Sequence, residues 1–275
     1  MVSQHVTIHG ISLLPLGRPA GSAEPRSIEP TARKGVSLVL NEFAQLPGVP
    51  AITLSQDELA ALPENTAPAP WPLVARAIFW AGRPDATARA AIEKVVPQEI
   101  RDGATPLAVY GGLIRYDRTP VGVYSEVTAV VVYRRGRHLF TTVPFMAVDS
   151  PTSVAGGREN WALPKTLATF TGEPQNHTTM SATGPGWRVA ASIHAGRVPM
   201  PFVAPSLLPQ VQKGPGGELY SVRLGGRGIA RRARVDIAVD APPALRDWFP
   251  EGQRSGILQT RLVSHFGVAD RSTAG

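Results

Sequence analysis

The sequence predicts an α+β, β-rich fold in which a barrel-like antiparallel sheet is covered by a few short helices. The 275 residues include 27 glycines and 27 prolines, a content that favours short strands joined by turns over long helices. From residue 107 onward, apolar or alternating runs of strand length follow one another. Before that point, two segments carry residues typical of helix starts.

Residues 1–69 are predicted to form an N-terminal extension. Apolar runs at 6–16 and 36–40 indicate one or two strands around a Pro/Gly/Ser-rich loop. Ser55 and Glu58 have the spacing of a capping box and predict a short helix. A Pro/Ala-rich linker then precedes the main domain, which we expect at 70–270, with a tail at 271–275.

In the main domain, Asp85 is predicted to cap a helix that runs to about Val96. Short helices are expected at 205–211 and 243–248, and the glycine-rich stretches 214–217 and 225–228 are expected to be turns. Further strands are predicted at 107–116, 121–133, 138–148, 163–172, 178–182, 187–194, 219–224, 233–239 and 257–266.

Composition excludes several classes of function. The chain has no cysteine, and its six histidines are scattered, so we expect no metal site and no cofactor. No apolar run approaches the roughly 18 residues of a membrane span, and no signal peptide is evident at the start, so we expect a cytoplasmic protein that binds no membrane. The net charge of +7 suits an anionic substrate; the basic clusters at 134–138 and 231–234 lack interleaved aromatic residues, so no nucleic acid is expected.

Lys165 is the candidate catalytic residue. Only four of the 28 basic residues are lysines, and Lys165 alone is embedded among apolar residues, following Trp161, Leu163 and Pro164. A lysine in a dry site can lose its proton, and the free amine then attacks carbonyl carbons. The alternative is a lysine whose stem packs on the core while its ammonium stays in water.

Three segments carry a resemblance to a known family. These are the run from Gly157-Arg158-Glu159 to Pro164-Lys165, the triplet Tyr124-Ser125-Glu126, and the strand Arg76 to Phe79. In this order they resemble the acetoacetate decarboxylase superfamily over residues 70–270. The resemblance implies a β-cone or barrel wrapped by further sheet and helix, with Lys165 as the Schiff-base lysine.

The resemblance also implies roles for other residues. Glu126 would move protons between carbinolamine and imine, and Arg76 or Arg158 would bind the carboxylate of a small keto acid. Four apolar side chains are candidates for a dry wall around the substrate, with ordinary core packing as the alternative: Trp161, Phe145, Met146 and Phe170. A homo-oligomer is also expected.

Two positions depart from the family pattern. Thr166 stands where the decarboxylases have a second lysine, and Gly111 stands where they have a second glutamate. Desolvation alone would therefore have to lower the pKa of Lys165, and the two smaller residues would leave room in the site. Three functions stay open: decarboxylation of an acetoacetate-like β-keto acid, a pyruvate aldolase-dehydratase reaction with the same lysine, and non-catalytic ligand binding or assembly.

Overall fold

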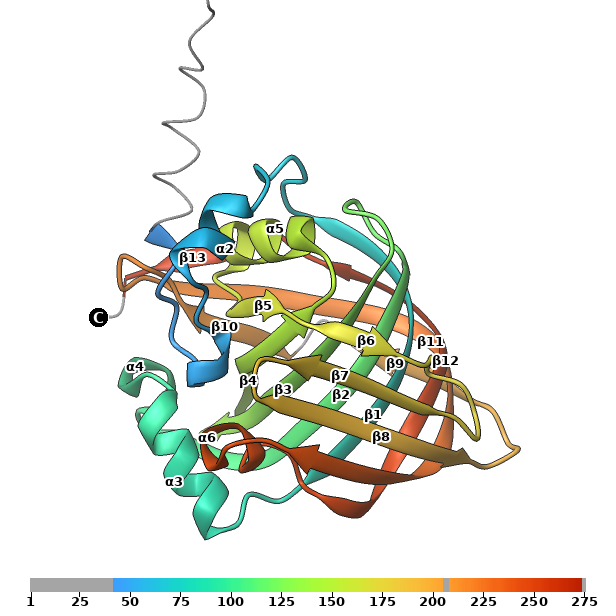
Figure 1. The fold of residues 1–275 in the computed structure, drawn as a ribbon. Coiled ribbons are helices and arrows are strands. Elements are labelled where there is room, and N and C mark those ends of the chain that lie inside the picture. The colour runs from blue at the N-terminus through green and yellow to red at the C-terminus, as the bar shows by residue number, and fades with distance from the viewer. Residues whose placement is uncertain (1–41, 205–207, 274–275) are drawn as a thin grey trace, which may run out of the picture.

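A sheet closed into a cone forms most of the computed structural model, which describes residues 42–204 and 208–273 (Figure 1). Within these residues the closed ring runs in the order β10-β4-β3-β2-β1-β12-β11 and returns to β10. Neighbours in the ring are antiparallel except β10 and β4, which are parallel. The ring strands are β1 (Trp71–Gly82), β2 (Thr105–Arg118), β3 (Tyr124–Arg135), β4 (His138–Val148), β10 (Pro209–Lys213), β11 (Leu219–Asp240) and β12 (Gly252–Phe266).

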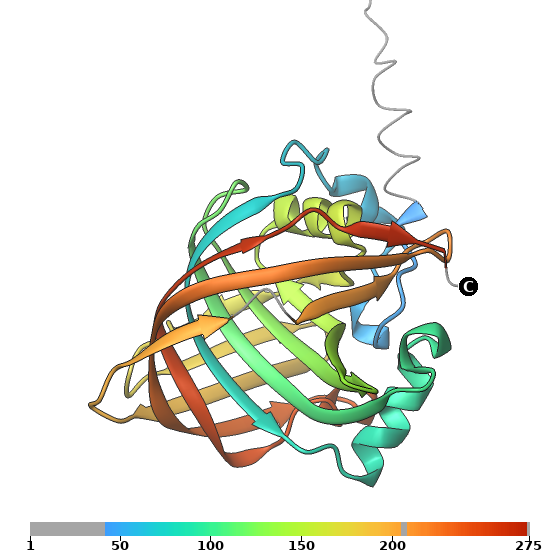
Figure 2. The same cartoon turned by 180° about the vertical axis from the view of Figure 1, so that it is seen from behind.

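A second group of strands wraps one flank of the cone. The long β11 crosses the back of the molecule (Figure 2), and its C-terminal part pairs with β8 (Trp187–Ala195). From β8 the sheet continues through β7 (Thr179–Gly184) to β6 (Thr169–Thr171). β9 (Met200–Ala204) and β13 (Asp270–Ser272) add to β11, and β5 (Lys165–Leu167) lies parallel to β4.

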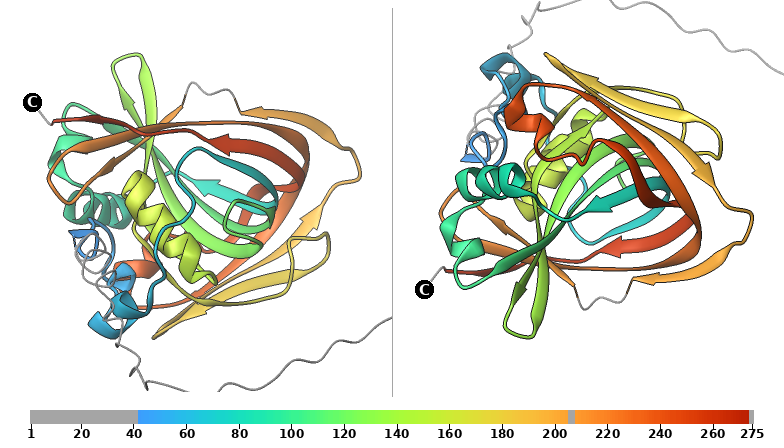
Figure 3. Two further views of the ribbon diagram at one scale, coloured as in Figure 1. Left: turned by 90° about the horizontal axis from the view of Figure 1, so that it is seen from above. Right: turned by 90° about the horizontal axis from the view of Figure 1, so that it is seen from below.

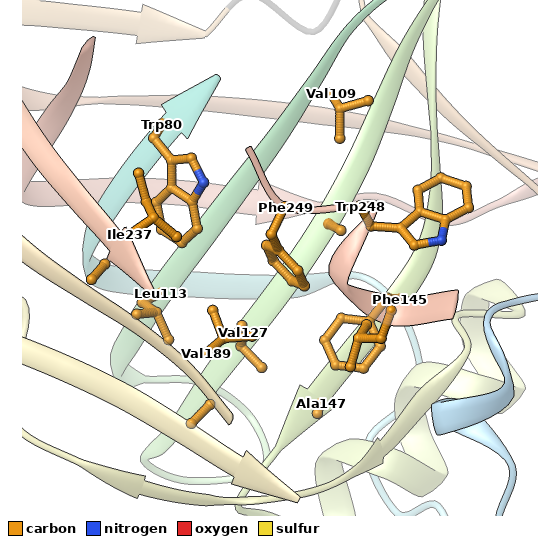
Figure 4. Packing of buried hydrophobic residues seen from close by; sticks show 14 of the residues in the cluster. Trp80, Val109, Leu113, Val127, Phe145, Ala147, Val189, Ile237, Trp248 and Phe249 are labelled. Atoms are coloured by element: carbon orange, nitrogen blue, oxygen red, sulfur yellow. The ribbon is translucent and has the colours of Figure 1, made fainter. Parts of the chain in front are cut away.

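Each ring strand presents alternate side chains to two separate cores. The core between the cone and the wrapping strands contains Trp80, Phe145 and Trp187, and Figure 4 shows Phe145 beside Phe249. The core inside the cone contains Met146 and other apolar residues from β1, β3 and β12. A strand residue therefore faces one core or the other, according to its position in the alternation.

The helices cover the ends and rim of the cone. Seen from above (Figure 3, left), α5 lies across one end of the ring. Two predicted caps are confirmed: Ser55 and Glu58 form a capping box on α2, and Asp85 caps α3. The helical elements are η1 (Pro50–Ile52), α2 (Gln56–Ala61), α3 (Ala86–Val95), α4 (Gln98–Arg101), α5 (Pro151–Trp161) and α6 (Pro243–Arg246).

The β-rich fold and nearly all predicted strands of the main domain are confirmed, with three differences. The stretch 225–228 is not a turn but the middle of β11, where a Cβ on Gly226 would lie 2.7 Å from Ser264 Cβ. The predicted helix at 205–211 is wrong over 209–211, which belongs to β10, and 205–207 lie outside the described residues. The helix α5 was not predicted. The apolar runs at 6–16 and 36–40 also lie outside the described residues.

Gly111 faces the wrapping strands and not the interior of the cone. A Cβ at this position would lie 2.4 Å from the indole of Trp80, whereas a Cβ on the neighbouring Gly112 would meet the Phe79 ring from the other side of the sheet. The expectation that Gly111 leaves room near Lys165 is therefore wrong, because the indole of Trp80 occupies that space.

We expect Gly111→Ala to lower the free energy of unfolding by about 1–3 kcal/mol, because overpacking in a filled core forces side chains and backbone to shift. Gly196→Ala is the matched control, since the nearest atom to a Cβ there is 3.6 Å away. Urea denaturation of both variants tests the expectation. Equal stability of the two variants would contradict the close packing of Trp80 on Gly111.

Candidate active site

Lys165 lies at the start of β5, beside α5. The helix ends at Trp161, its C-cap residue Ala162 adopts the left-handed conformation (φ 52°), and the chain then turns into β5. The side chain of Lys165 is only 3% exposed and runs along Gly157, where a Cβ would lie 2.6 Å from Lys165 Cδ. This glycine therefore makes space for the lysine stem, and the alternative of an ammonium group in water is excluded.

The Lys165 ammonium lies between a carboxylate and a hydroxyl group inside the cone. Nζ donates to Glu126 Oε2 at 3.1 Å and to Ser153 Oγ at 2.9 Å. The Tyr116 hydroxyl donates to the other oxygen of Glu126 at 3.3 Å, and Nζ lies 5.1 Å from the centroid of the Tyr124 ring. The structure thus brings together the two predicted catalytic residues, Lys165 and Glu126.

Ser153 and Tyr116 are site residues that the sequence interpretation missed. Ser153 is fully buried on α5, one helical turn before Gly157, so both face the lysine side chain. The hydroxyl of Ser150 caps the helix, and Pro151 occupies its first turn. The spacing Ser-x-x-x-Gly in front of the lysine was the available signal. Tyr116 lies only ten residues before Glu126, and the register between β2 and β3 brings its hydroxyl to the carboxylate.

The pKa of Lys165 shifts in the opposite direction to the one predicted. Burial lowers the pKa of its ammonium, but Tyr124 and the Glu126 carboxylate raise it, and the net pKa lies above the ordinary 10.5. Desolvation alone therefore does not produce a free amine, because the carboxylate stabilises the charged form. A neutral amine at Lys165 therefore requires the loss of a proton that Tyr124 and Glu126 help to hold.

Three tyrosines on the inner face of the cone keep their protons at neutral pH. Burial raises the pKa of Tyr116, Tyr124 and Tyr110, and the negative charge of Glu126 raises each of them further. In the case of Tyr124, Lys165 partly opposes the shift. The interior therefore offers hydroxyl donors around a single lysine–carboxylate pair.

Arg158 has a structural role in this geometry and not the substrate-binding role that was predicted. Its fully buried guanidinium donates to the carbonyl oxygens of Lys165 (2.7 Å), Phe43 (2.6 Å), Ala44 (3.2 Å) and Ile52 (2.8 Å). Burial lowers the pKa of Arg158 to about 10, which leaves the group charged at neutral pH. The arginine ties residues 43–52 to the start of β5.

Arg76 lies on the outer face of the cone, away from Lys165. In the β1–β2–β3 register, Arg76 is opposite Arg115, and Arg115 is opposite Ser125, whereas Glu126 belongs to the other face. The guanidinium of Arg76 pairs with Asp117 at 2.8 Å and with Glu173 at 3.0 Å. This position does not support the predicted contact between Arg76 and the substrate carboxylate.

The predicted wall residues divide between the two cores. Met146 is paired with Lys165 in the β4–β5 register and belongs, with Trp161, to the core inside the cone. Phe145 lies in the other core, against Trp187, so its predicted contact with substrate is not supported. Thr166 follows Lys165 on β5 and is opposite Ala147, so it also belongs to the outer face and leaves the space around Lys165 unchanged.

The described residues contain no cluster of three or more His, Cys, Asp or Glu side chains able to hold a metal ion. In the same part of the chain, no helix is long and apolar enough to cross a membrane.

Two comparisons with known proteins find similarity to acetoacetate decarboxylases. A family model described as acetoacetate decarboxylase matches residues 86–197. The acetoacetate decarboxylase from Legionella pneumophila has a similar structure, with a TM-score of 0.55, 16% identity, and coverage of 77% of this chain and 90% of that chain. No curated protein sequence matches this chain.

Two further structures share the fold. The enduracididine biosynthesis enzyme MppR, in complex with the condensation product of pyruvate and imidazole 4-carboxaldehyde, has a TM-score of 0.55 at 13% identity and covers 83% of this chain and 97% of its own. An acetoacetate decarboxylase-like enzyme from Sphingomonas wittichii RW1 has a TM-score of 0.51 at 18% identity, covering 76% and 94%. With its cone-shaped sheet, the chain has the fold of the acetoacetate decarboxylases, and residues 86–197 match their family model.

We expect Arg158→Lys to lower the free energy of unfolding by at least about 2 kcal/mol, because each buried carbonyl oxygen left without a donor costs about 1–3 kcal/mol. Arg76→Lys is the control, and weakening its partly exposed ion pairs should lower the free energy of unfolding by no more than about 1 kcal/mol. Urea denaturation measures both. Unchanged stability of Arg158→Lys together with a raised KM would instead place Arg158 at the substrate.

We expect Glu126→Gln to lower the pKa of Lys165, because the change removes a carboxylate that raises this pKa while the burial that lowers it remains. The free amine would then form at lower pH than in the wild type. Lysine-selective ¹³C labelling gives one Cε signal for each of the four lysines, and their titration by NMR provides the midpoints.

Glu99→Gln is the matched control, since Glu99 pairs with the partly exposed Lys213 at 2.7 Å. It should leave the midpoint of Lys165 unchanged. If Glu126→Gln also leaves that midpoint unchanged, the carboxylate does not hold the ammonium group.

Proposed function

We propose that this protein is a Schiff-base-forming lyase that decarboxylates an acetoacetate-like β-keto acid through an imine on Lys165. The observation that carries the proposal is the position of Lys165 Nζ, buried inside the cone within hydrogen-bond distance of Glu126 and Ser153. A buried amine with an adjacent proton acceptor is the arrangement that imine formation requires.

In the proposed reaction, Glu126 accepts a proton from the Lys165 ammonium, and the amine attacks the ketone carbon of the substrate. Glu126 returns the proton as the carbinolamine loses water, which leaves a protonated imine. The bond to the carboxylate then breaks, its electron pair moves through the α-carbon to the imine nitrogen, and CO₂ leaves an enamine. Protonation of the enamine carbon and hydrolysis release the ketone and the free lysine.

The surroundings of Lys165 favour decarboxylation over an aldol reaction. An aldolase must hold the carboxylate of pyruvate throughout the reaction, which calls for a fixed cation. Neither predicted arginine is available for this, because Arg158 binds backbone carbonyls and Arg76 lies on the outer face. The loss of CO₂ instead removes the negative charge of the substrate carboxylate from a dry site. The nearby Glu126 carboxylate repels that charge and so favours its removal.

Two alternatives remain as outcomes of the test. One is an aldolase-dehydratase reaction of pyruvate with an aldehyde, which uses the same lysine and yields a conjugated enone. The other is non-catalytic ligand binding or assembly, in which Lys165 stays protonated. Because the pKa of Lys165 is raised, the two cases differ in whether Glu126 accepts the proton of the lysine. A cytoplasmic location and a homo-oligomer remain part of the proposal.

We expect borohydride treatment in the presence of acetoacetate to add mass at Lys165, with CO₂ released in the untreated reaction. Lys165→Arg should form no adduct and release no CO₂, because arginine keeps its proton. Glu126→Gln should reduce turnover by about 10²–10⁴-fold, the usual contribution of a general acid–base group. Peptide mass spectrometry and CO₂ detection provide the measurements.

Lys94→Arg serves as the matched control, because Lys94 is exposed on α3. It should behave as the wild type does. Enone absorbance with pyruvate plus an aldehyde, and no CO₂ from acetoacetate, would favour the aldolase alternative. The absence of any adduct under either condition would support the non-catalytic one.

A further inference from the structure

A cavity of about 850 Å³ lies inside the cone, and no step of the proposed reaction uses it. Its lining comes from opposite sides of the ring, including β1, β2, β4, β10, β11 and β12. Most of the side chains that line it are apolar or aromatic. Representative residues are Phe79, Tyr110, Leu139, Leu224 and Leu262, together with Gln210.

Tyr110 connects this cavity with the Lys165 centre. It lines the cavity, and its pKa is raised by burial and by the charge of Glu126. Tyr110 also lies on the same face of β2 as Tyr116, which donates a hydrogen bond to Glu126. The two regions therefore share the interior of the cone.

Gln210 provides a second observation that points to a ligand. Its side chain is 5% exposed and lines the cavity, and its Nε2 has no hydrogen-bond partner. Two residues along β10, Gln212 is buried to the same degree, but its amide is fully used by Thr142 and by both backbone groups of Val143. A buried donor without a partner is costly unless something supplies an acceptor, and Gln210 makes no contact through Nε2 that would explain it structurally.

We propose that this cavity holds an apolar substituent of the substrate, and that Gln210 donates a hydrogen bond to an oxygen atom on that substituent. The inference rests on the proposed function and adds the substrate class: β-keto acids with a large, mainly apolar group in place of the methyl group of acetoacetate. Pockets of about 300–1,000 Å³ hold drug-sized ligands, so a four-carbon acid would leave most of this space empty.

Decanol tests the cavity separately from the chemistry of Lys165, because it has no carbonyl group and its hydroxyl oxygen can accept from Gln210. We expect calorimetry to show binding of one decanol molecule per wild-type chain. Ser264→Phe places a ring in the cavity and should weaken binding by roughly tenfold or more, since the apolar surface of the ligand is then no longer buried. The control is His265→Phe, at the exposed next position on β12, which should bind normally.

Gln210→Met should weaken decanol binding about three- to tenfold, the value of one hydrogen bond, without lowering the stability of the protein. Gln212→Met should lower stability, because it removes three hydrogen bonds. The Gln210 variant also keeps the proposal testable if Ser264→Phe fails to fold. A loss of stability in Gln210→Met, or no binding of decanol to the wild type, would overturn the inference.

The final comparison uses acetoacetate and β-ketodecanoate as substrates for borohydride trapping at Lys165. The wild type should trap the longer acid at lower concentration, and Ser264→Phe should abolish this preference while it still traps acetoacetate. Decanol binding without any trapped adduct would refute the lysine chemistry and leave the cavity assignment standing. Trapping of acetoacetate without decanol binding, or with no preference for the longer acid, would refute the cavity assignment alone.

Discussion

The buried guanidinium of Arg158 holds together the end of the cone that carries Lys165. It binds carbonyl oxygens of two segments that are far apart in the sequence: residues 43–52, through Phe43, Ala44 and Ile52, and the start of β5 at Lys165. Only arginine has enough donors in a planar arrangement to satisfy them together. Because one of these carbonyls belongs to Lys165 itself, the position of the lysine backbone depends on the same network that attaches residues 42–69 to the cone.

The second constraint is electrostatic. Lys165 and Glu126 are both almost fully buried. A buried ion pair is stable only when both charges are present and when further hydrogen bonds satisfy the remaining donor and acceptor atoms of the two side chains. Ser153 and Tyr116 provide those hydrogen bonds. The same pairing raises the pKa of the lysine, so burial alone does not produce a neutral amine at this position.

The alternation of side chains along the strands determines which neighbours reach this centre. Thr166 and Gly111 differ from the family pattern, yet both face the wrapping strands, so the two departures do not alter the space around Lys165. Phe145 and Arg76 fall on the outer face for the same reason, whereas Met146 and Tyr116 fall on the inner one. A shift of one residue along a strand is enough to exchange these roles.

The sequence by itself determined the β-rich fold, most strands and two helix caps, because these depend on local patterns. A short motif singled out Lys165 and Glu126 as candidates, and the structure brings the two together. It did not determine which face of the closed sheet each strand residue occupies or which distant segments surround it. The predicted roles of Arg158 and Arg76 therefore do not agree with their positions in the structure. Ser153 and the cavity beside Tyr110 arise only when α5 and the ring strands meet. Their positions depend on contacts between residues far apart in the chain, which only the tertiary structure specifies.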